Sequence, residues 1–149
     1  PPAELLSFLR DHEVDYRLIH HPVVYTAQEL AAVLGIKGRQ FAKVVVLAEG
    51  AALKLAVLSA DCRIDFTRLP GHRLASEPEI TKVFVPYAVG AIPPFGELFG
   101  VPTLLDELFP TKEPIAFEAG THADAIKING ADFLKLARPQ LASFADKVT

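Results

Sequence analysis

Ala42-Lys43-Val44-Val45-Val46-Leu47-Ala48 is the stretch of this chain that decides the fold, and Ala52–Ser59 follows it as a second apolar run. Short apolar runs bounded by turn signals are typical of strands, and Glu49-Gly50-Ala51 supplies the turn between these two. The pair therefore predicts a hairpin. Its first strand is almost wholly apolar, which indicates a strand covered on both faces at the centre of a sheet.

Helix signals flank this hairpin on both sides. Apolar side chains at helical spacing predict an amphipathic helix over the first dozen residues. Thr26-Ala27-Gln28-Glu29 and Ser76-Glu77-Pro78-Glu79 are capping boxes, in which a hydroxyl and a carboxylate satisfy the free amides at a helix start. Gly35 is expected to end the first of these two helices.

The rest of the chain predicts further short elements. Asp61 is expected to cap a short helix that runs up to Leu69. A last helix is expected to begin at Asn129 or Gly130 and to stop before Arg138-Pro139, because the residue before a proline disfavours the helical conformation. Four more runs are predicted strands: Tyr16–His20, Val101–Leu105, Ile115–Glu118 and Ala125–Ile128.

Length and composition predict one compact α/β domain over residues 1–149, with a mixed, mostly antiparallel sheet and surrounding helices. At this size about 68–70% of the unfolded surface can be buried, and 50% of the residues are hydrophobic. The apolar runs are too short to span a bilayer, and the N-terminal residues lack a signal pattern. The single cysteine, Cys62, fits a reducing compartment. We therefore expect a soluble, cytoplasmic protein without a membrane partner.

Charge is unevenly distributed along the chain. The formal net charge of −3 argues against a general nucleic-acid binder, so DNA is not an expected partner. Between Gly35 and Val85, however, eight Lys or Arg residues stand against five carboxylates. Such a basic zone could meet phosphates, and an ordinary mixed surface explains it equally well.

Common catalytic and metal signatures are absent from the sequence. There is no Gly-x-Ser-x-Gly elbow, no Walker-type loop and no Rossmann glycine pattern. His20 and His21 are adjacent, so on a strand they point to opposite faces, and no cluster completes a metal site around them. Cys62 follows Asp61, where a helix start could stabilise a thiolate, but a small buried side chain is the favoured interpretation. We expect no metal.

Lys43 is the first candidate site residue. It stands at the start of the apolar strand, where a lone charge is costly unless the ammonium group reaches solvent or an anion. A lysine that extends its charged end to solvent is the structural alternative.

Ala119-Gly120-Thr121-His122 is the second candidate segment. It combines a glycine, which lets backbone amides approach a ligand, with a hydroxyl and an imidazole. Asp124 could share one side of an extended segment with His122, and there it would either orient the ring or cap the turn. A polar connection between two strands is the structural alternative.

Gly90-Ala91-Ile92-Pro93-Pro94-Phe95-Gly96 is the third candidate segment. The two prolines fix φ and remove two backbone donors, while the flanking glycines permit conformations closed to other residues. Such a loop is suited to form a rigid wall of a binding pocket. Phe95 is as well suited to anchor the loop in the core as to touch a substrate, and a purely structural turn is the alternative.

These three segments, in this order, resemble the YbaK/ProX family of free-standing aminoacyl-tRNA deacylases, which is similar to the insertion editing domain of bacterial prolyl-tRNA synthetases. The resemblance extends from Thr26 to about Arg138 and implies a sheet curled around a pocket. In the family, the lysine of the Ala-Lys-Val-Val pattern holds the tRNA acceptor end, which corresponds to Lys43 here, and a loop histidine that corresponds to His122 positions the substrate.

The resemblance also implies the remaining site residues. The loop matches the family's Gly-Gly-x-Ser-Pro-Phe-Gly wall of the amino-acid pocket, but Ala91 replaces its second glycine and Pro93 its small polar residue, which puts the usual specificity in doubt. Backbone amides near Gly120 would stabilise the oxyanion, and the catalytic set is Lys43, Gly120 and His122. The implied substrate-binding residues are Gly90, Ile92, Pro93, Pro94, Phe95, Gly96 and Thr121.

The activity implied by the resemblance is trans-editing, the hydrolysis of the ester of a tRNA mischarged with a small amino acid such as Ala, Ser, Thr or Cys, with tRNA for proline as the expected carrier. The partners would be the acceptor end of that tRNA and, as a candidate, prolyl-tRNA synthetase. No cofactor is required, because the substrate's own ribose hydroxyl is proposed to activate water. Two alternatives stay open: a noncatalytic tRNA- or synthetase-binding module of the same fold, and a hydrolase of small aminoacyl esters.

Overall fold

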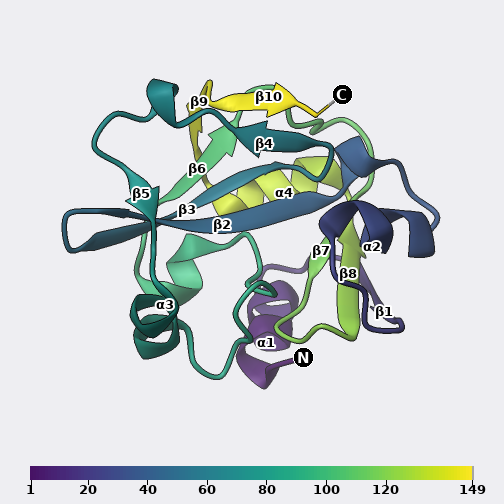
Figure 1. Ribbon diagram of the computed structural model, residues 1–149. Coiled ribbons are helices and arrows are strands. Elements are labelled where there is room, and N and C mark those ends of the chain that lie inside the picture. The colour runs from purple at the N-terminus through teal and green to yellow at the C-terminus, as the bar shows by residue number, and fades with distance from the viewer. Residues whose placement is uncertain (149) are drawn as a thin grey trace.

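A long hairpin forms the centre of the protein in the computed structural model, which describes residues 1–148. β2 (Ala42–Glu49) and β3 (Ala52–Ser59) pair antiparallel along their whole length. Figure 1 shows the hairpin crossing the middle of the molecule. It belongs to a five-stranded sheet in the order β5-β2-β3-β6-β9, which β5 (Arg73–Leu74), β6 (Thr103–Asp106) and β9 (Gln140–Ala142) complete.

Both faces of this central sheet are covered, as the apolar run predicts. Along a strand, successive side chains point to opposite faces. Val46 and Val57 therefore lie in the larger hydrophobic core, while Leu47 and Leu58 lie in a second core on the other face. The pairing is mixed, because β2 is antiparallel to β3 and β5, whereas β3-β6 and β6-β9 are parallel.

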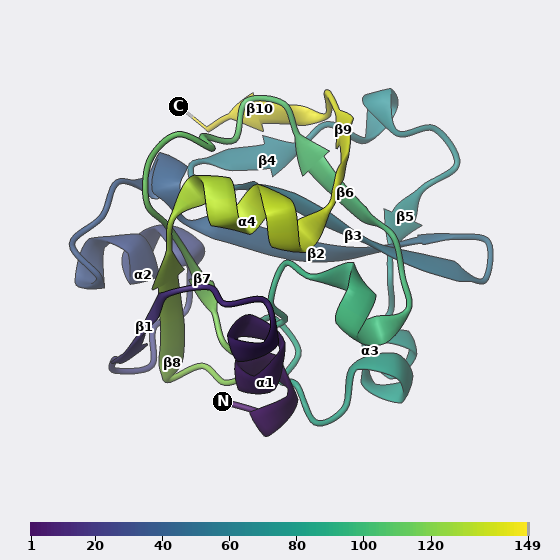
Figure 2. The ribbon, with the colours of Figure 1, turned by 180° about the vertical axis from the view of Figure 1, so that it is seen from behind.

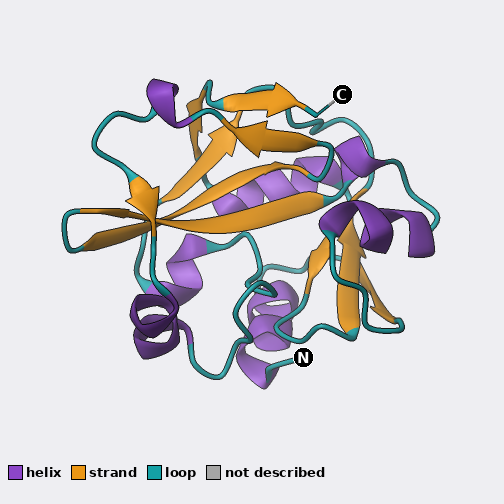
Figure 3. Ribbon diagram, in the orientation of Figure 1, coloured by secondary structure: helices purple, strands orange, loops and turns teal. Residues whose placement is uncertain are grey.

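Two smaller sheets flank the central one (Figure 3). β8 (Asp124–Ile128) pairs antiparallel with β1 (Tyr16–His20) on one side and with β7 (Ile115–Glu118) on the other. β4 (Cys62–Ile64) pairs with β10 (Ala145–Lys147). A single bridge between Phe41 and Ala116 joins the beginning of β2 to β7, so the strands curl toward each other at this corner.

Within the described residues, four α-helices surround the sheets: α1 (Ala3–Asp11), α2 (Ala27–Val33), α3 (Glu77–Phe84) and α4 (Gly130–Ala137). Seen from behind, α4 covers the central sheet, while α1 and α3 lie beside each other below it (Figure 2). Leu5 and Leu9 of α1 and Phe133 of α4 are fully buried in the larger core. None of the described helices is long and apolar enough to cross a membrane.

Helix ends follow the predicted chemistry. Ser76 and Glu79 form the complete capping box at α3. At α2, Thr26 accepts the Glu29 amide at 3.0 Å, but the Glu29 carboxylate accepts from the Thr26 hydroxyl rather than from its amide, so only half of that box forms. Gly35 follows α2 with a φ of +70°, the left-handed conformation typical of a helix stop.

Some predicted elements are wrong, and each error has a local cause. Asp61 caps no helix, because β4 follows it directly; a single 3-10 turn, Phe66–Arg68, comes later and is capped by Asp65. The strand expected from Val101 begins only at Thr103. The C-terminal strands were not predicted, since they are short and depend on the distant Asp106, whose carboxylate accepts the Phe144 amide at 2.9 Å.

One edge of β2 is open over a short stretch. The neighbouring strand β5 pairs only with Leu47 and Ala48, and the Val46 carbonyl accepts the Ala75 amide. Alternate residues of a strand direct their backbone groups to the same edge. Val44 therefore presents its N–H and C=O on the side where β5 has already ended.

Candidate functional site

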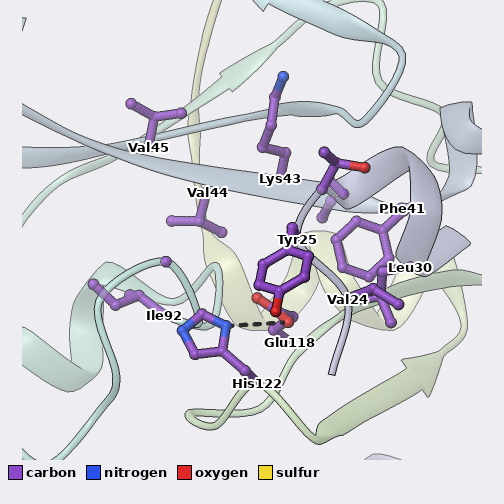
Figure 4. A pocket seen from close by; sticks show the side chains of 14 residues that line it. Val24, Tyr25, Leu30, Phe41, Lys43, Val44, Val45, Ile92, Glu118 and His122 are labelled. Atoms are coloured by element: carbon purple, nitrogen blue, oxygen red, sulfur yellow. Dashed lines mark ion pairs between the residues drawn. The ribbon is translucent and has the colours of Figure 1, made fainter. Parts of the chain in front are cut away.

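A cavity of about 290 Å³ lies at this open edge of β2. Three other segments close around it: the chain leading into α2, the Gly90 loop, and the end of β7 with the turn that follows (Figure 4). Its lining residues are Val24, Tyr25, Thr26, Ala27, Leu30, Phe41, Ala42, Lys43, Val44, Val45, Gly90, Ile92, Glu118 and His122.

Glu118 reaches the cavity through the alternation of β7. Ile115 and Phe117 point into the larger core, whereas Ala116 points to the small core beneath α2. The next residue on that second face is Glu118, and its side chain is only 14% exposed. The strand register therefore places a carboxylate in a mostly apolar cavity.

His122 is held by the loop opposite it. Its Nε2 lies 2.9 Å from the carbonyl oxygen of Val89. A carbonyl can only accept, so Nε2 carries a proton, and the ring in its neutral form has its lone pair on Nδ1. That Nδ1 faces Glu118 Oε1 at 3.8 Å (Figure 4).

Burial decides the protonation of Glu118. Removal from water disfavours the ionised form and raises the pKa of Glu118 to about 7, while the nearby His21 acts in the opposite direction. At neutral pH the carboxyl group is consequently poised between its two forms. A group of this kind in a cleft is typical of functional sites.

Lys43 lines the same cavity from the other face of β2. Its side chain and that of Val45 point away from Glu118 and His122, whereas Val44 points toward Ile92 (Figure 4). The Lys43 ammonium donates to the Cys62 carbonyl, and burial lowers the pKa of Lys43. The cavity thus passes over the strand edge, with a cation on one side and the Glu118–His122 pair on the other.

The Gly90–Gly96 loop contributes two residues to the wall. Gly90 has a φ of +85°, and a Cβ there would lie 3.3 Å from His122 Cε1, so the glycine lets the ring pack against the loop. Ile92 also lines the cavity.

The rest of this loop does not line the cavity. Pro93 and Pro94 are buried, and Phe95 packs edge-on against Phe117 with ring centroids 5.2 Å apart. A Cβ on Gly96 would lie 2.2 Å from the Val101 carbonyl oxygen. The substrate contacts predicted for these four residues are therefore not placed at the cavity, and their role in this structure is to anchor the loop.

The turn before His122 is also largely structural. The Gly120 amide donates to the Ala91 carbonyl at 2.8 Å, so it is not free to bind an oxyanion in this conformation. Thr121 donates to Asp124 at 2.6 Å instead of facing the cavity. Of the two predicted alternatives for Asp124, the structure has the turn cap, because His122 pairs with Glu118 and not with Asp124.

Sequence reasoning missed Glu118 and the segment before α2. The signal for Glu118 was present, since a carboxylate ends an otherwise apolar strand four residues before His122. Tyr25, at the cavity mouth, is 92% exposed, an unusual position for a large aromatic side chain. Cys62 is a small buried side chain, which confirms the favoured interpretation of the sequence, and burial raises the pKa of its thiol to about 11.

The sequence profile of the aminoacyl-tRNA editing domain matches residues 21–136, a range that contains every residue lining the cavity. The chain belongs to the aminoacyl-tRNA editing domain family. It is 30% identical to the multifunctional Ser/Thr-tRNA deacylase ProXp-y of Escherichia coli K12, over 94% of this chain and 90% of that protein.

Solved structures agree with the editing-domain fold. A proposed trans-editing enzyme for prolyl-tRNA synthetase superposes with a TM-score of 0.81 at 24% identity, covering 97% of this chain and 96% of the other. A hypothetical protein superposes with a TM-score of 0.83 at 16% identity, covering 96% and 99%. At these identities the likeness concerns the fold.

Proposed function

We propose that this editing domain acts in trans and removes a small amino acid, serine or threonine first, from mischarged tRNA. Family membership identifies the chain as an aminoacyl-tRNA hydrolase. The observation that carries the proposal is the cavity over the β2 edge, which has Lys43 on one face and Glu118 with His122 on the other. Alanine and cysteine are further candidate amino acids, and tRNA for proline is the candidate carrier.

The two sides of the strand edge suit the two halves of such a substrate. On one side, Lys43 can bind the phosphate or ribose of the terminal nucleotide, since an ammonium group is a compact point charge for an anion. On the other, the space between Ile92, Val44 and His122 takes the amino acid. The ester linkage then lies at the edge itself, beside the backbone groups of Val44.

The reaction needs little from the protein. Water adds to the ester carbonyl, the bond to the ribose oxygen breaks, and the products are a free amino acid and a tRNA with a free terminal hydroxyl. With Nε2–H donated to Val89, the neutral His122 ring offers its Nδ1 lone pair, which can accept a hydrogen bond from a water molecule or from the amino group of the substrate. In this proposal the substrate's ribose hydroxyl activates the water.

Selectivity among amino acids would come from the limited size of the cavity. Apolar contacts distinguish one methylene by only about 1–3 kcal/mol, so synthetases mischarge tRNA with smaller amino acids and a second site must remove them. The cavity is bounded by the apolar side chains of Leu30, Phe41, Val44 and Ile92, which limit the size of the amino acid. The named activity of ProXp-y supports serine and threonine as the first substrates to test.

The test is a deacylation panel with purified protein and tRNAs carrying Ser, Thr, Ala, Cys and the cognate amino acid. Lys43→Ala is expected to lower kcat/KM by about 10- to 100-fold, the value of a hydrogen bond to a charged group. Lys82→Ala, at an exposed lysine outside the cavity, is the matched control. Circular dichroism and thermal melting establish that both variants fold.

Other results would redirect the proposal. Absence of turnover over the whole panel would indicate a noncatalytic binding module. Equal activity on short aminoacyl esters, with no salt dependence, would indicate a small-molecule hydrolase, because tRNA recognition weakens as salt rises.

A further inference from the structure

The Glu118 side chain is only 14% exposed, and its carboxylate accepts no hydrogen bond from residues 1–148. The nitrogen that faces it, His122 Nδ1, is 3.8 Å away, beyond hydrogen-bond distance. Most polar groups that folding removes from water find a hydrogen-bond partner, so a largely desolvated carboxylate without one in the protein is unusual. Here the carboxylate faces a cavity, and a ligand in that cavity can supply the missing partner.

The charges around Glu118 restrict what this partner can be. His122 approaches from the turn and His21 from the segment after β1, while the Lys43 ammonium is directed to Cys62 on the other face of β2. His21 already uses Nδ1 on the Pro22 carbonyl. Glu118 is also the single carboxylate among the residues that line the cavity. An ionised carboxylate at such a site is best balanced by a cation that can also donate hydrogen bonds.

We propose that Glu118 binds the α-ammonium group of the aminoacyl ester, so that the site accepts esters with a free amino group and rejects those whose amino group is acylated. This inference rests on the proposed function and adds a specificity rule to it. Every aminoacyl-tRNA carries this amino group, whatever its side chain. Glu118 therefore recognises the part that all substrates share, while Ile92 and its apolar neighbours limit the part that varies.

A neutral hydroxyl of the ribose fits the observations less well. It could donate to the carboxylate, but it would leave the largely desolvated negative charge unbalanced. An ammonium group supplies both the charge and the donors. With that group bound, Glu118 is ionised, and His122 lies beside the same carboxylate, with Nδ1 3.8 Å from Oε1.

The first experiment needs no variant. Hydrolysis of seryl-tRNA is compared with that of N-acetyl-seryl-tRNA by the wild-type protein, and each rate is divided by the spontaneous hydrolysis of the same ester, because loss of the ammonium group itself slows ester hydrolysis. If threonine is the better substrate in the panel, the threonyl pair replaces it. We expect a preference for the free amino group of at least about tenfold after this correction. Equal corrected rates would overturn the inference while leaving the deacylase function intact.

The second experiment assigns the preference to Glu118. Glu118→Gln keeps the size of the side chain and removes its charge, and it is expected to reduce the corrected preference to less than about threefold, chiefly by slowing the free-amino substrate. The matched control is Glu113→Gln, a carboxylate that pairs with Arg39 outside the cavity. A preference that survives in folded Glu118→Gln would overturn the assignment. No hydrolysis of any unblocked ester by the wild type would instead refute the proposed function.

Discussion

Glu118 and Asp124 stand at the two ends of one turn, and their surroundings are opposite. Asp124 accepts a hydrogen bond from the Thr121 hydroxyl at 2.6 Å and pairs with His20, and the Thr121 bond is the main reason that the pKa of Asp124 is lowered. Glu118 accepts no hydrogen bond from the described residues, and burial raises its pKa to about 7. Each carboxylate has a histidine beside it, yet only one of the two is satisfied within the protein.

The difference separates a structural carboxylate from a functional one. The two carboxylate oxygens of Asp124 interact with the Thr121 hydroxyl and with His20, and these contacts stabilise the turn that carries His122. Glu118 costs the fold free energy, because an ionised carboxyl group that is largely desolvated and accepts no hydrogen bond is less stable there than in water. A group of this kind at the wall of a cavity is typical of a binding site, because a bound ligand can offset that free-energy cost.

The largest expected effect is on the pH dependence of stability. The folded-state pKa of Glu118, about 7, lies above its ordinary value of 4.5, so the folded protein binds more protons between these values and becomes less stable as the pH rises through them. Glu118→Gln removes this loss and is expected to exceed the wild type at about pH 8 by up to about 3 kcal/mol, with little gain at about pH 4. Urea unfolding at both pH values measures it.

Asp124 is expected to change stability with pH in the opposite direction. Its folded-state pKa lies below the ordinary 3.8, so its contribution is present above that value and is lost as the pH falls through the folded-state pKa. Asp124→Asn should therefore be destabilised near neutral pH and converge with the wild type in acid. His21 and His122, which face Glu118, are common to the wild type and both variants. Parallel stability curves for the wild type and Glu118→Gln would remove the contrast between the two carboxylates.

The next largest effect is expected from replacing His122, with His20 as the comparison. His122→Ala is expected to reduce kcat/KM about tenfold or more, because it deletes the directed hydrogen bond at the cavity. His20→Ala, which removes the 75% exposed partner of Asp124, should retain the wild-type rate. Both are measured by deacylation of the best substrate of the panel. Equal losses for the two variants would mean that these residues act through the stability of the turn rather than through the site.

The smallest effect concerns the turn itself. Thr121→Val deletes the hydroxyl that donates to Asp124 and accepts the Ala123 amide, and is expected to lower the free energy of unfolding by about 1 kcal/mol. Chemical denaturation measures this change. If the variant instead keeps full stability and loses turnover, then Thr121 contacts the substrate, as the family resemblance implied.

Much of the scaffold was predictable from the sequence because its signals are local. The apolar hairpin, the Ser76 capping box and the helix after Asn129 depend on residues that are neighbours in the chain. The β4 strand was missed because its pairing with β10 joins segments far apart in sequence, and no local pattern reports it.

The site was predictable only in part for a related reason. A motif shows which residues lie together in the sequence but not which of them face a cavity. Gly90, His122 and Lys43 face it, whereas Phe95 and Gly96, in the same loop as Gly90, turn into the core. The alternation that places Glu118 is visible in the sequence, but the cavity that it faces and its lack of a hydrogen bond appear only in the folded structure.

The open stretch of β2 also bears on whether another polypeptide can pair with this sheet. An unpaired strand edge is a template on which another polypeptide can add a strand, and long flat edges promote aggregation. Here the Phe41–Ala116 bridge closes one end and β5 closes the other, so that only about three residues, 43–45, remain accessible. Such a gap is too short to template a strand, yet it is long enough for a nucleotide to reach the backbone.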